Sequence, residues 1–312
     1  MTEPDSYTST RYLTAKATVD ARSRHPRLYN AFVTSLTDTD EAPLRLFEMG
    51  GGVGTLCKRL LTDLLARGTS AITYTMVDTD AEAIAQAKES LAEWARDRDM
   101  DVFAAGERLV FSDATADIAL HIRNDDAFAF LEAYDEAPFD GIVAQAVLDI
   151  VHVSTILDHF RDSSHPGTHW YLPIHFDGVT AFEPTVDPDL DATIERLFHD
   201  SMHGTVDPHG PKGGPTTGRT LLTALPDAGA APVDAAASDW IVYARDNGAY
   251  PADEAYFLHH ILHFVESELA GHPDLDADAF ADWLRIRRDQ IASGDLVYLA
   301  HQVDVLAQAV KN

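Results

Sequence analysis

A glycine-rich turn between a strand and a helix constrains the fold more than any other feature of the chain. Residues 44–48 (LRLFE) have the composition of a short buried strand, and residues 53–67 form a helical pattern with leucines on one face. The turn that joins them reads GGGVG at 50–54. Glycines permit a tight turn and the close approach of a ligand, and the helix that follows offers unpaired N–H groups. The pattern predicts a ligand site at the first strand–helix junction of an α/β fold.

Two common interpretations of such a loop fit poorly. The dinucleotide fingerprint places glycines at its first, third and sixth positions, but the sixth position counted from Gly50 is Thr55. A phosphate-binding P-loop ends in G-K-[ST], and this loop has no such ending. Neither a nicotinamide dinucleotide nor a P-loop nucleotide is therefore favoured as the ligand.

Strand and helix patterns alternate as far as Phe176. Strand patterns lie at 71–77, 108–112, 139–147 and 169–176, and helix patterns lie at 81–97 and 115–134. Alternation of this kind implies right-handed crossovers and a doubly wound, mainly parallel sheet.

The pattern changes after Phe176. Residues 177–217 are rich in proline and glycine and are expected to form an inserted lid. Next come a helix pattern near 218–226, two β-rich runs at 232–238 and 239–244 that suggest a terminal hairpin, and helix patterns at 253–270, 277–292 and 295–310. We therefore expect an N-terminal helical cap (1–35), a sheet domain (36–245) that carries the lid, and a C-terminal helical extension (246–312).

The charge of the chain limits its partners. Its 51 acidic and 23 basic residues give a formal charge of −28, which repels nucleic acid phosphates and anionic membrane surfaces. Asp outnumbers Glu and Arg greatly outnumbers Lys, a profile typical of halophilic proteins, whose concentrated counterions screen self-repulsion. Cys57 is the single cysteine, and no segment has the apolar length of a signal peptide or a membrane span. These observations predict a halophilic, cytoplasmic protein that binds neither nucleic acid nor membranes.

Two acids follow the predicted second and third strands. Asp78 stands 24 residues beyond Gly54, where a carboxylate can accept hydrogen bonds from both hydroxyls of a ribose. Asp113 follows the strand pattern at 108–112, where it could accept from an adenine amino group. Together with the loop, the chain between about 40 and 245 resembles the class I S-adenosylmethionine-dependent methyltransferases, whose E/D-x-G-x-G-x-G loop, ribose acid and adenine acid occur in this order. The resemblance implies a seven-stranded sheet with a reversed final hairpin and S-adenosyl-L-methionine as cofactor.

The resemblance also implies roles for individual residues. Gly50, Gly52 and Gly54 would face the methionine part, Glu48 would orient the loop, Asp78 would hold the ribose and Asp113 the adenine. In the basic N-terminal segment at 11–22, Lys16 or Arg22 would pair with the methionine carboxylate.

The segment after the fourth strand is the place where the resembled family meets its acceptor. The [DN]-P-P-[YFW] motif of enzymes that methylate nucleic acid bases is missing there, and so is the acid pair of aminopropyltransferases. His152, assisted by Asp149, is the expected proton acceptor, because an imidazole with a pKa near 6.5 is available as a base at neutral pH. His175 and Asp177, after the fifth strand, are the next pair. We expect methyl transfer to oxygen or nitrogen of a small molecule, including lipid or pigment precursors. Protein or peptide methylation, or a cofactor-binding scaffold without turnover, are the alternatives.

Clusters of histidine raise the question of a metal site. His259, His260 and His263 share one helical face, and His199 and His203 repeat the spacing of four. However, H-E-x-x-H is absent and the neighbouring residues are apolar, which indicates a packed helix. No metal is expected.

Overall fold

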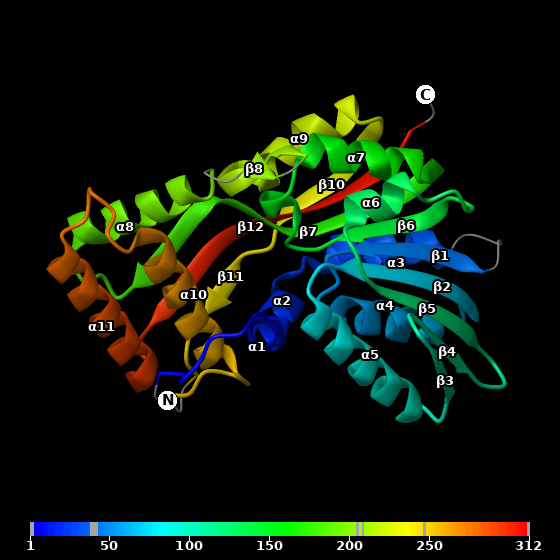
Figure 1. Cartoon of the computed structure of the whole chain (residues 1–312), viewed down its shortest axis with the longest axis horizontal. Helices are drawn as coiled ribbons and strands as arrows, with labels where there is room; N and C mark the ends of the chain where they lie inside the picture. The colour runs from blue at the N-terminus through cyan, green and yellow to red at the C-terminus, as the bar shows by residue number, and fades with distance from the viewer. Residues whose placement is uncertain (1–2, 38–42, 204–205, 208, 246–247, 311–312) are drawn as a thin grey trace.

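The computed structural model describes residues 3–37, 43–203, 206–207, 209–245 and 248–310. Its centre is a ten-stranded sheet (Figure 1). In sheet order the strands are β10 (Ala230–Ala237), β12 (Val297–Ala309), β7 (Ser164–Glu183), β6 (Phe139–Ala144), β1 (Leu44–Met49), β2 (Ala71–Asp78), β5 (Asp117–Asn124), β4 (Arg108–Ser112) and β3 (Asp101–Ala105), and β11 (Trp240–Val242) also pairs with β12.

The middle of the sheet is parallel. β7, β6, β1, β2 and β5 run in the same direction, whereas β12 runs antiparallel to both β7 and β10. β1 and β6 are largely buried on both faces because helices cover both sides of the sheet. The predicted doubly wound, mainly parallel sheet is confirmed, with seven strands from β10 to β5 and three more, β3, β4 and β11.

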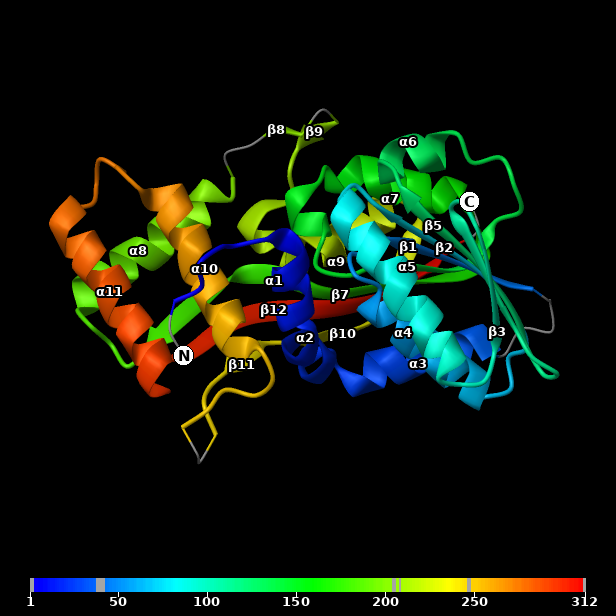
Figure 2. The ribbon, with the colours of Figure 1, turned by 60° about the horizontal axis from the view of Figure 1, so that its bottom comes forward.

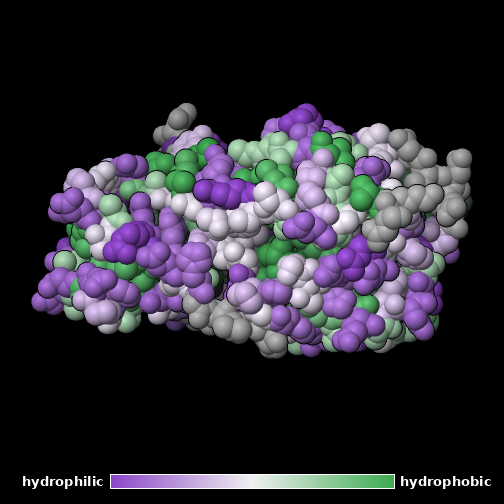
Figure 3. Space-filling view, turned by 90° about the horizontal axis from the view of Figure 1, so that it is seen from above, coloured by the Kyte–Doolittle hydropathy of each residue, from purple (hydrophilic) through white to green (hydrophobic). Residues whose placement is uncertain are grey.

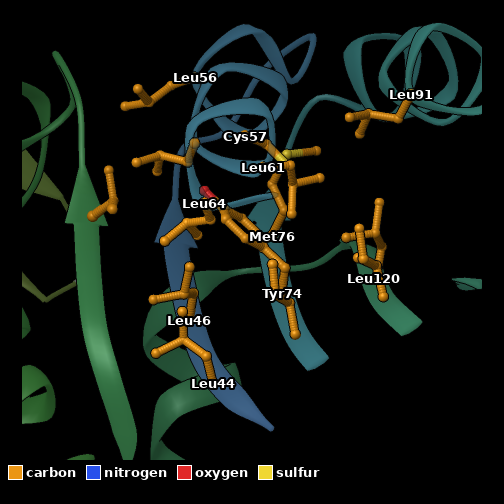
Figure 4. Close-up of a cluster of buried hydrophobic side chains, with 14 of the residues drawn as sticks. Leu44, Leu46, Leu56, Cys57, Leu61, Leu64, Tyr74, Met76, Leu91 and Leu120 are labelled. Atoms are coloured by element: carbon orange, nitrogen blue, oxygen red, sulfur yellow. The ribbon is translucent and has the colours of Figure 1, made fainter. Parts of the chain in front are cut away.

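Two helical layers hold the sheet between them. One face is covered by α3 (Pro26–Thr37), α4 (Thr55–Ala66) and α5 (Ala81–Arg96), and the other by α6 (Ala127–Glu132), α7 (Val153–Asp162) and α9 (Thr217–Asp227). Figure 4 shows leucines of α4 packed on Leu44, Leu46, Tyr74 and Met76 of the first two strands, with the thiol of Cys57 among them. Burial raises the pKa of that thiol well above its usual value, so Cys57 belongs to the core.

A second lobe lies at one end of the molecule. There α8 (Pro188–Ser201), α10 (Glu254–Leu269) and α11 (Ala277–Ser293) pack around the extended ends of β7 and β12. The N-terminal helices α1 (Ser9–Ala15) and α2 (Ala17–Ser23) lie between this lobe and the helices of the main sheet (Figure 2), and α1 contacts both α10 and α5.

Three sequence expectations about elements are wrong. Residues 117–124 form β5 instead of part of a helix at 115–134, and residues 297–309 form β12 instead of a helix at 295–310. Both segments alternate buried and more exposed side chains along part of their length, a period of two that is typical of strands. The runs at 232–238 and 239–244 do not pair with each other as a hairpin, because each pairs with β12 instead.

The expected lid at 177–217 is also more regular than its composition suggests. β7 continues to Glu183 and α8 begins five residues later, so a strand and a helix fill about half of the segment. Residues 204, 205 and 208 of this segment lie outside the described part of the chain.

Polar residues cover most of the face seen in Figure 3, and hydrophobic side chains form separate patches on it.

The acidic charge of the chain predicts that its stability depends on salt. With a formal charge of −28, self-repulsion opposes compaction in dilute salt. We expect the melting temperature to rise between roughly 0.1 and 2 M potassium chloride, as the Debye length falls from about 10 Å to about 2 Å. Differential scanning calorimetry across this range measures the effect. A melting temperature that does not change would contradict the halophilic interpretation and leave the fold assignment intact.

Candidate active site

A cavity of about 440 Å³ lies at the carboxyl ends of β1, β2, β5 and β6. In open parallel sheets ligands bind at this edge, where the loops after the strands converge. The glycine loop forms its floor and the side chains of Asp78, Asp125 and Val147 contribute to its walls. The sequence-predicted ligand site therefore coincides with a cavity.

The glycine loop is shaped for close approach. Gly50, Gly52 and Gly54 have φ values of +66°, +52° and +77°, in the left-handed region that favours glycine. A Cβ atom on Gly50 would lie 3.0 Å from Cγ2 of Val147, and one on Gly52 would lie 3.1 Å from Cδ1 of Leu13. The loop leads directly into α4, whose first residue, Thr55, also lines the cavity. The first N–H groups of a helix have no partner within the helix and can bind a ligand.

Asp78 stands at the end of β2, as the sequence predicts, and lines the cavity. Its Oδ2 accepts a hydrogen bond from the N–H of Gly52 at 2.8 Å, and its Oδ1 accepts from the N–H of Asp80 at 2.9 Å. The carboxylate is thus held beside the loop in a fixed orientation. A ligand with neighbouring hydroxyl groups can reach its remaining lone pairs.

The expectation for Asp113 is wrong. β4 is antiparallel to β5, so the residue after it lies at the opposite edge of the sheet, where Asp113 accepts N–H groups of Thr115 and Ala116 and borders a different cavity. The acids that follow the parallel strand β5 and line the cavity of about 440 Å³ are Asp125 and Asp126. We call this cavity the cofactor-side cavity. The sequence contains a pattern that could have indicated this, because two β-rich runs on either side of Gly106 are typical of a hairpin. The second strand of a hairpin runs in the opposite direction, which places Asp113 at the other edge of the sheet.

Glu48 lies beneath the loop and does not line the cavity. Its Oε2 accepts a hydrogen bond from the hydroxyl of Tyr74 at 2.8 Å, and only 2% of the residue is exposed. Loss of solvation raises the pKa of this carboxyl to about 8. Glu48 is therefore a buried, largely protonated support for the loop at neutral pH.

The two N-terminal cations have different positions. Lys16 lines the cavity and its Nζ lies 3.1 Å from Oδ2 of Asp20, which is buried. Asp20 also accepts hydrogen bonds from Gln145 at 3.1 Å and from the indole N–H of Trp240 at 3.0 Å. Arg22 instead pairs with the buried Glu254 of α10, outside the residues that line the cavity. Sequence reasoning missed Asp20 and Gln145, which come together only in the fold.

The charges of the cavity fit one kind of nucleoside. Within the described part of the chain its lining contains five aspartates (Asp20, Asp78, Asp80, Asp125 and Asp126) and one cation, Lys16. Such a lining repels a pyrophosphate or triphosphate. It suits a nucleoside without phosphate that carries positive charge, and the sulfonium and ammonium groups of S-adenosyl-L-methionine have that charge.

A second cavity, of about 580 Å³, adjoins the first. Five residues line both cavities, namely Ser9, Leu13, Lys16, Ala146 and Ile150. The rest of its lining is mostly apolar and includes seven aromatic residues: Tyr7, Tyr12, Phe176, Phe198, Trp240, Phe264 and Tyr298. We call it the aromatic cavity.

Two lining residues of the aromatic cavity have strained backbones. Ala146, two residues after β6, and Ile174, in the middle of β7, have φ values of +51° and +61°. The N–H of Ala146 donates to the carbonyl of Pro173 at 3.1 Å, and the N–H of Ile174 donates to the buried carboxylate of Asp304 at 2.8 Å. Such strain persists only where surrounding contacts hold it, and it is concentrated at functional sites.

Of the four acid–base candidates, Asp149 is the one that lines the aromatic cavity. His152 lies outside both linings, with its Nδ1 2.7 Å from the hydroxyl of Thr155. His175 is fully buried, which lowers its pKa to about 3, so it stays neutral. Asp177 accepts from the guanidinium of Arg219 at 2.7 Å and also lies outside both linings.

The histidines of α10 have packing partners. His260 and His263 line the aromatic cavity, and the ring of His263 stacks on Tyr7 with a centroid distance of 4.3 Å. Burial lowers the pKa of His259 and of His260 to about 4. In the described residues, no three histidine, cysteine or acidic side chains are placed to share a metal ion. No helix among them is long and apolar enough to cross a membrane.

Comparisons with known proteins agree with the geometry of the cofactor-side cavity. Residues 28–188 match the family model described as "Putative S-adenosyl-L-methionine-dependent methyltransferase". No curated protein matches the chain.

Several solved structures are similar in outline. A methyltransferase from Thiobacillus denitrificans in complex with S-adenosyl-L-homocysteine is 15% identical, with 99% of this chain and 100% of that one covered and a TM-score of 0.47. A methyltransferase from Methanosarcina mazei is 13% identical, with coverages of 92% and 99% and a TM-score of 0.45. Phosphoethanolamine N-methyltransferase 2 from Haemonchus contortus is 12% identical, with coverages of 98% and 58% and a TM-score of 0.45.

The family assignment rests on the family model, which matches more than half of the chain and includes the glycine loop, Asp78 and Asp125. The chain therefore belongs to the family of S-adenosyl-L-methionine-dependent methyltransferases, and S-adenosyl-L-methionine is its cofactor.

Proposed function

We propose that the enzyme methylates an oxygen or nitrogen atom of a small organic molecule held in the aromatic cavity. The observation that carries this proposal is the shared wall, since the cofactor-side cavity and the aromatic cavity meet at Lys16, Ala146 and Ile150. A protein substrate is less well accommodated, because α1 and α10 enclose the aromatic cavity on the side away from the sheet. The single cysteine and the acid excess support a cytoplasmic enzyme of a high-salt cell.

In this proposal, different residues of the cofactor-side cavity bind different parts of S-adenosyl-L-methionine. The carboxylate of Asp78 accepts from the ribose hydroxyls, and Asp125 or Asp126 accepts from the adenine amino group. Lys16, held by Asp20, faces the methionine carboxylate, and the glycine loop lies against the methionine chain. S-adenosyl-L-methionine supplies a methyl group on a sulfonium, which becomes a neutral thioether when an acceptor lone pair takes the methyl.

Asp149 replaces His152 as the proposed proton acceptor. It belongs to the short helix η1 (Leu148–Ile150) after β6 and lines the aromatic cavity. Loss of solvation raises the pKa of its carboxyl, an effect that the charges of Lys16 and Lys212 oppose. A carboxylate with a raised pKa is a stronger base than an aspartate in water.

We expect Asp78→Ala to weaken binding of S-adenosyl-L-homocysteine by about 1–3 kcal/mol, because the ribose hydroxyls lose their acceptor. Isothermal titration calorimetry at a salt concentration where the chain is folded measures the change. Asp113→Ala is the matched control and should leave the affinity unchanged, since Asp113 borders a different cavity. Equal losses in the two variants would contradict the assignment of the ribose subsite.

We also expect the N-terminal helices to close over the bound cofactor. Arg11 of α1 is half exposed, and its pairing with Asp253 is the surface contact that tethers this helix to the start of α10. Binding of S-adenosyl-L-homocysteine should slow tryptic cleavage at Arg11 several-fold, because the ligand packs against Leu13 and Lys16. The exposed Arg96 at the end of α5 serves as the internal control. Mass spectrometry follows both sites, and equal rates with and without ligand would argue against closure.

The experiment that tests the proposed function is a screen of a metabolite mixture with cofactor labelled in the methyl group. Label in a small-molecule product supports the proposal. Label in a protein fraction favours the alternative of protein methylation, and cofactor binding without any labelled product favours a scaffold that has lost turnover.

A further inference from the structure

The aromatic cavity combines many rings with very few charges. Besides its seven aromatic residues and the histidines His260 and His263, the described lining contains two charged side chains, Lys16 and Asp149. Its volume of about 580 Å³ is within the range of small-molecule sites, which is about 300–1,000 Å³. The lining therefore selects a flat, apolar body, and recognition of any charge on the ligand depends on these two groups.

The two charged side chains differ in whether the protein supplies them with a partner. The ammonium of Lys16 lies 3.1 Å from the buried carboxylate of Asp20, so its charge is balanced within the protein. Oδ1 of Asp149 is buried, and in the described part of the chain it has no hydrogen-bond partner. The residue's own backbone N–H and the charges of Lys16 and Lys212 favour the ionised form of the Asp149 carboxyl, but no side chain in the described part of the chain donates to Oδ1. A carboxylate oxygen left in this state calls for a donor from the ligand.

A cationic donor satisfies this oxygen better than a neutral one. A phenol or alcohol would supply a hydrogen bond but would leave the carboxylate of Asp149 without a cation in direct contact. The rings themselves favour cations, and the ammonium of Lys16 already lies 5.5 Å from the Trp240 ring and 5.9 Å from the Tyr12 ring. The net charge of −28 attracts cations to the molecule as a whole.

We infer that the acceptor is an amine on a flat, apolar body, and that Asp149 both binds its ammonium group and removes the proton. This inference rests on the proposed function, because it assigns the aromatic cavity to the acceptor. It names the acceptor atom as nitrogen and excludes acceptors whose recognition needs an anion site.

The proton and electron balance of the step is simple. The carboxylate of Asp149 takes one proton from the ammonium, which leaves a lone pair on the nitrogen. That lone pair forms the bond to the methyl carbon, and the electron pair of the broken carbon–sulfur bond stays on sulfur. The product is an ammonium with one more methyl group, and Asp149 returns its proton to solvent when the cavity opens.

Three compounds that share an indole ring but carry a positive, no or a negative charge test the inference without turnover. The enzyme is saturated with S-adenosyl-L-homocysteine, and tryptamine, tryptophol and indole-3-propionate are titrated into it by calorimetry. We expect tryptamine to bind at least about tenfold more tightly than the other two. Asp149→Asn should reduce this preference to less than about threefold while it keeps the affinity for S-adenosyl-L-homocysteine, which also shows that the variant is folded.

Asp158→Asn is the matched control, because it removes the same charge from an exposed position on α7 outside the cavity lining. It should keep the preference for tryptamine. Tighter binding of indole-3-propionate or tryptophol, a preference that survives in Asp149→Asn, or no binding of any of the three compounds at millimolar concentration would each overturn the inference. Failure of S-adenosyl-L-homocysteine to bind would instead contradict the proposed function itself.

Discussion

Replacement of Arg287 by methionine should destabilise the protein by about 3–5 kcal/mol. Arg287 is fully buried on α11, and its guanidinium donates to Oδ1 of Asp191 and to the carbonyl of Pro184, both at 2.7 Å. Asp191 is itself buried on α8 and also accepts from the indole N–H of Trp283. Methionine would fill a similar volume but leave the carboxylate of Asp191 without a cation in the interior. Denaturant unfolding at constant salt measures the change in free energy of unfolding.

Arg285→Met provides the control on the same helix. Arg285 is exposed and its ion pairs with Asp282 and Asp289 are on the surface, so the loss should stay below about 1 kcal/mol. A double variant, Arg287→Met with Asp191→Leu, should recover part of the stability, since no buried charge is left unpaired. If Arg287→Met and Arg285→Met had equal effects, the second lobe would not depend on the buried pair.

Replacement of Glu48 by glutamine should remove a pH dependence of stability between about pH 4.5 and 8. The pKa of this carboxyl is about 8 in the folded protein and 4.5 in the reference state, so the folded state binds the proton more tightly. Its stabilising contribution is complete below pH 4.5 and is lost as the pH rises through 8. Glutamine does not titrate and can still accept from Tyr74. At pH 9 the variant should therefore be more stable than the parent, on the order of 4 kcal/mol.

Unfolding curves at pH 5, 7 and 9 in the same potassium chloride concentration measure this difference. Glu89→Gln, an exposed change of the same chemistry on α5, should reproduce the slope of the parent. A Glu48→Gln variant that keeps the slope of the parent would show that Glu48 is ionised in the folded protein at neutral pH.

The cofactor-side features could be predicted from the sequence because they are local. The glycine loop and Asp78 follow strands that are mostly buried, so their positions at the carboxyl edge follow from the parallel direction of β1 and β2. The same argument gave a wrong position for Asp113. β4 is antiparallel to both β3 and β5, so it ends at the opposite edge of the sheet from the parallel strands. The direction of a strand is a tertiary property, and an acid after a strand indicates a ligand only when that direction is known.

The aromatic cavity could not be predicted in this way. Its lining comes from α1, η1, β7, α8, β11, α10 and β12, and many of these are far apart in the sequence. From the sequence alone, aromatic residues such as Tyr12 and Trp240 look the same whether they pack in a core or line a binding site. The way these elements meet, together with the strained backbone at Ala146 and Ile174, distinguishes a binding site from a core here.

The position of α1 as a wall of both cavities has a thermodynamic consequence. Because Ser9, Leu13 and Lys16 line both cavities, any ordering of α1 by one ligand prepares part of the site for the other. The two affinities are then linked, and by reciprocity each ligand must strengthen the other by the same factor. Methyl transfer changes both ligands at once, so it alters the coupling that holds the helix in place. If both products order α1 in this way, their release is cooperative, and the seven-residue helix α1 couples the two steps.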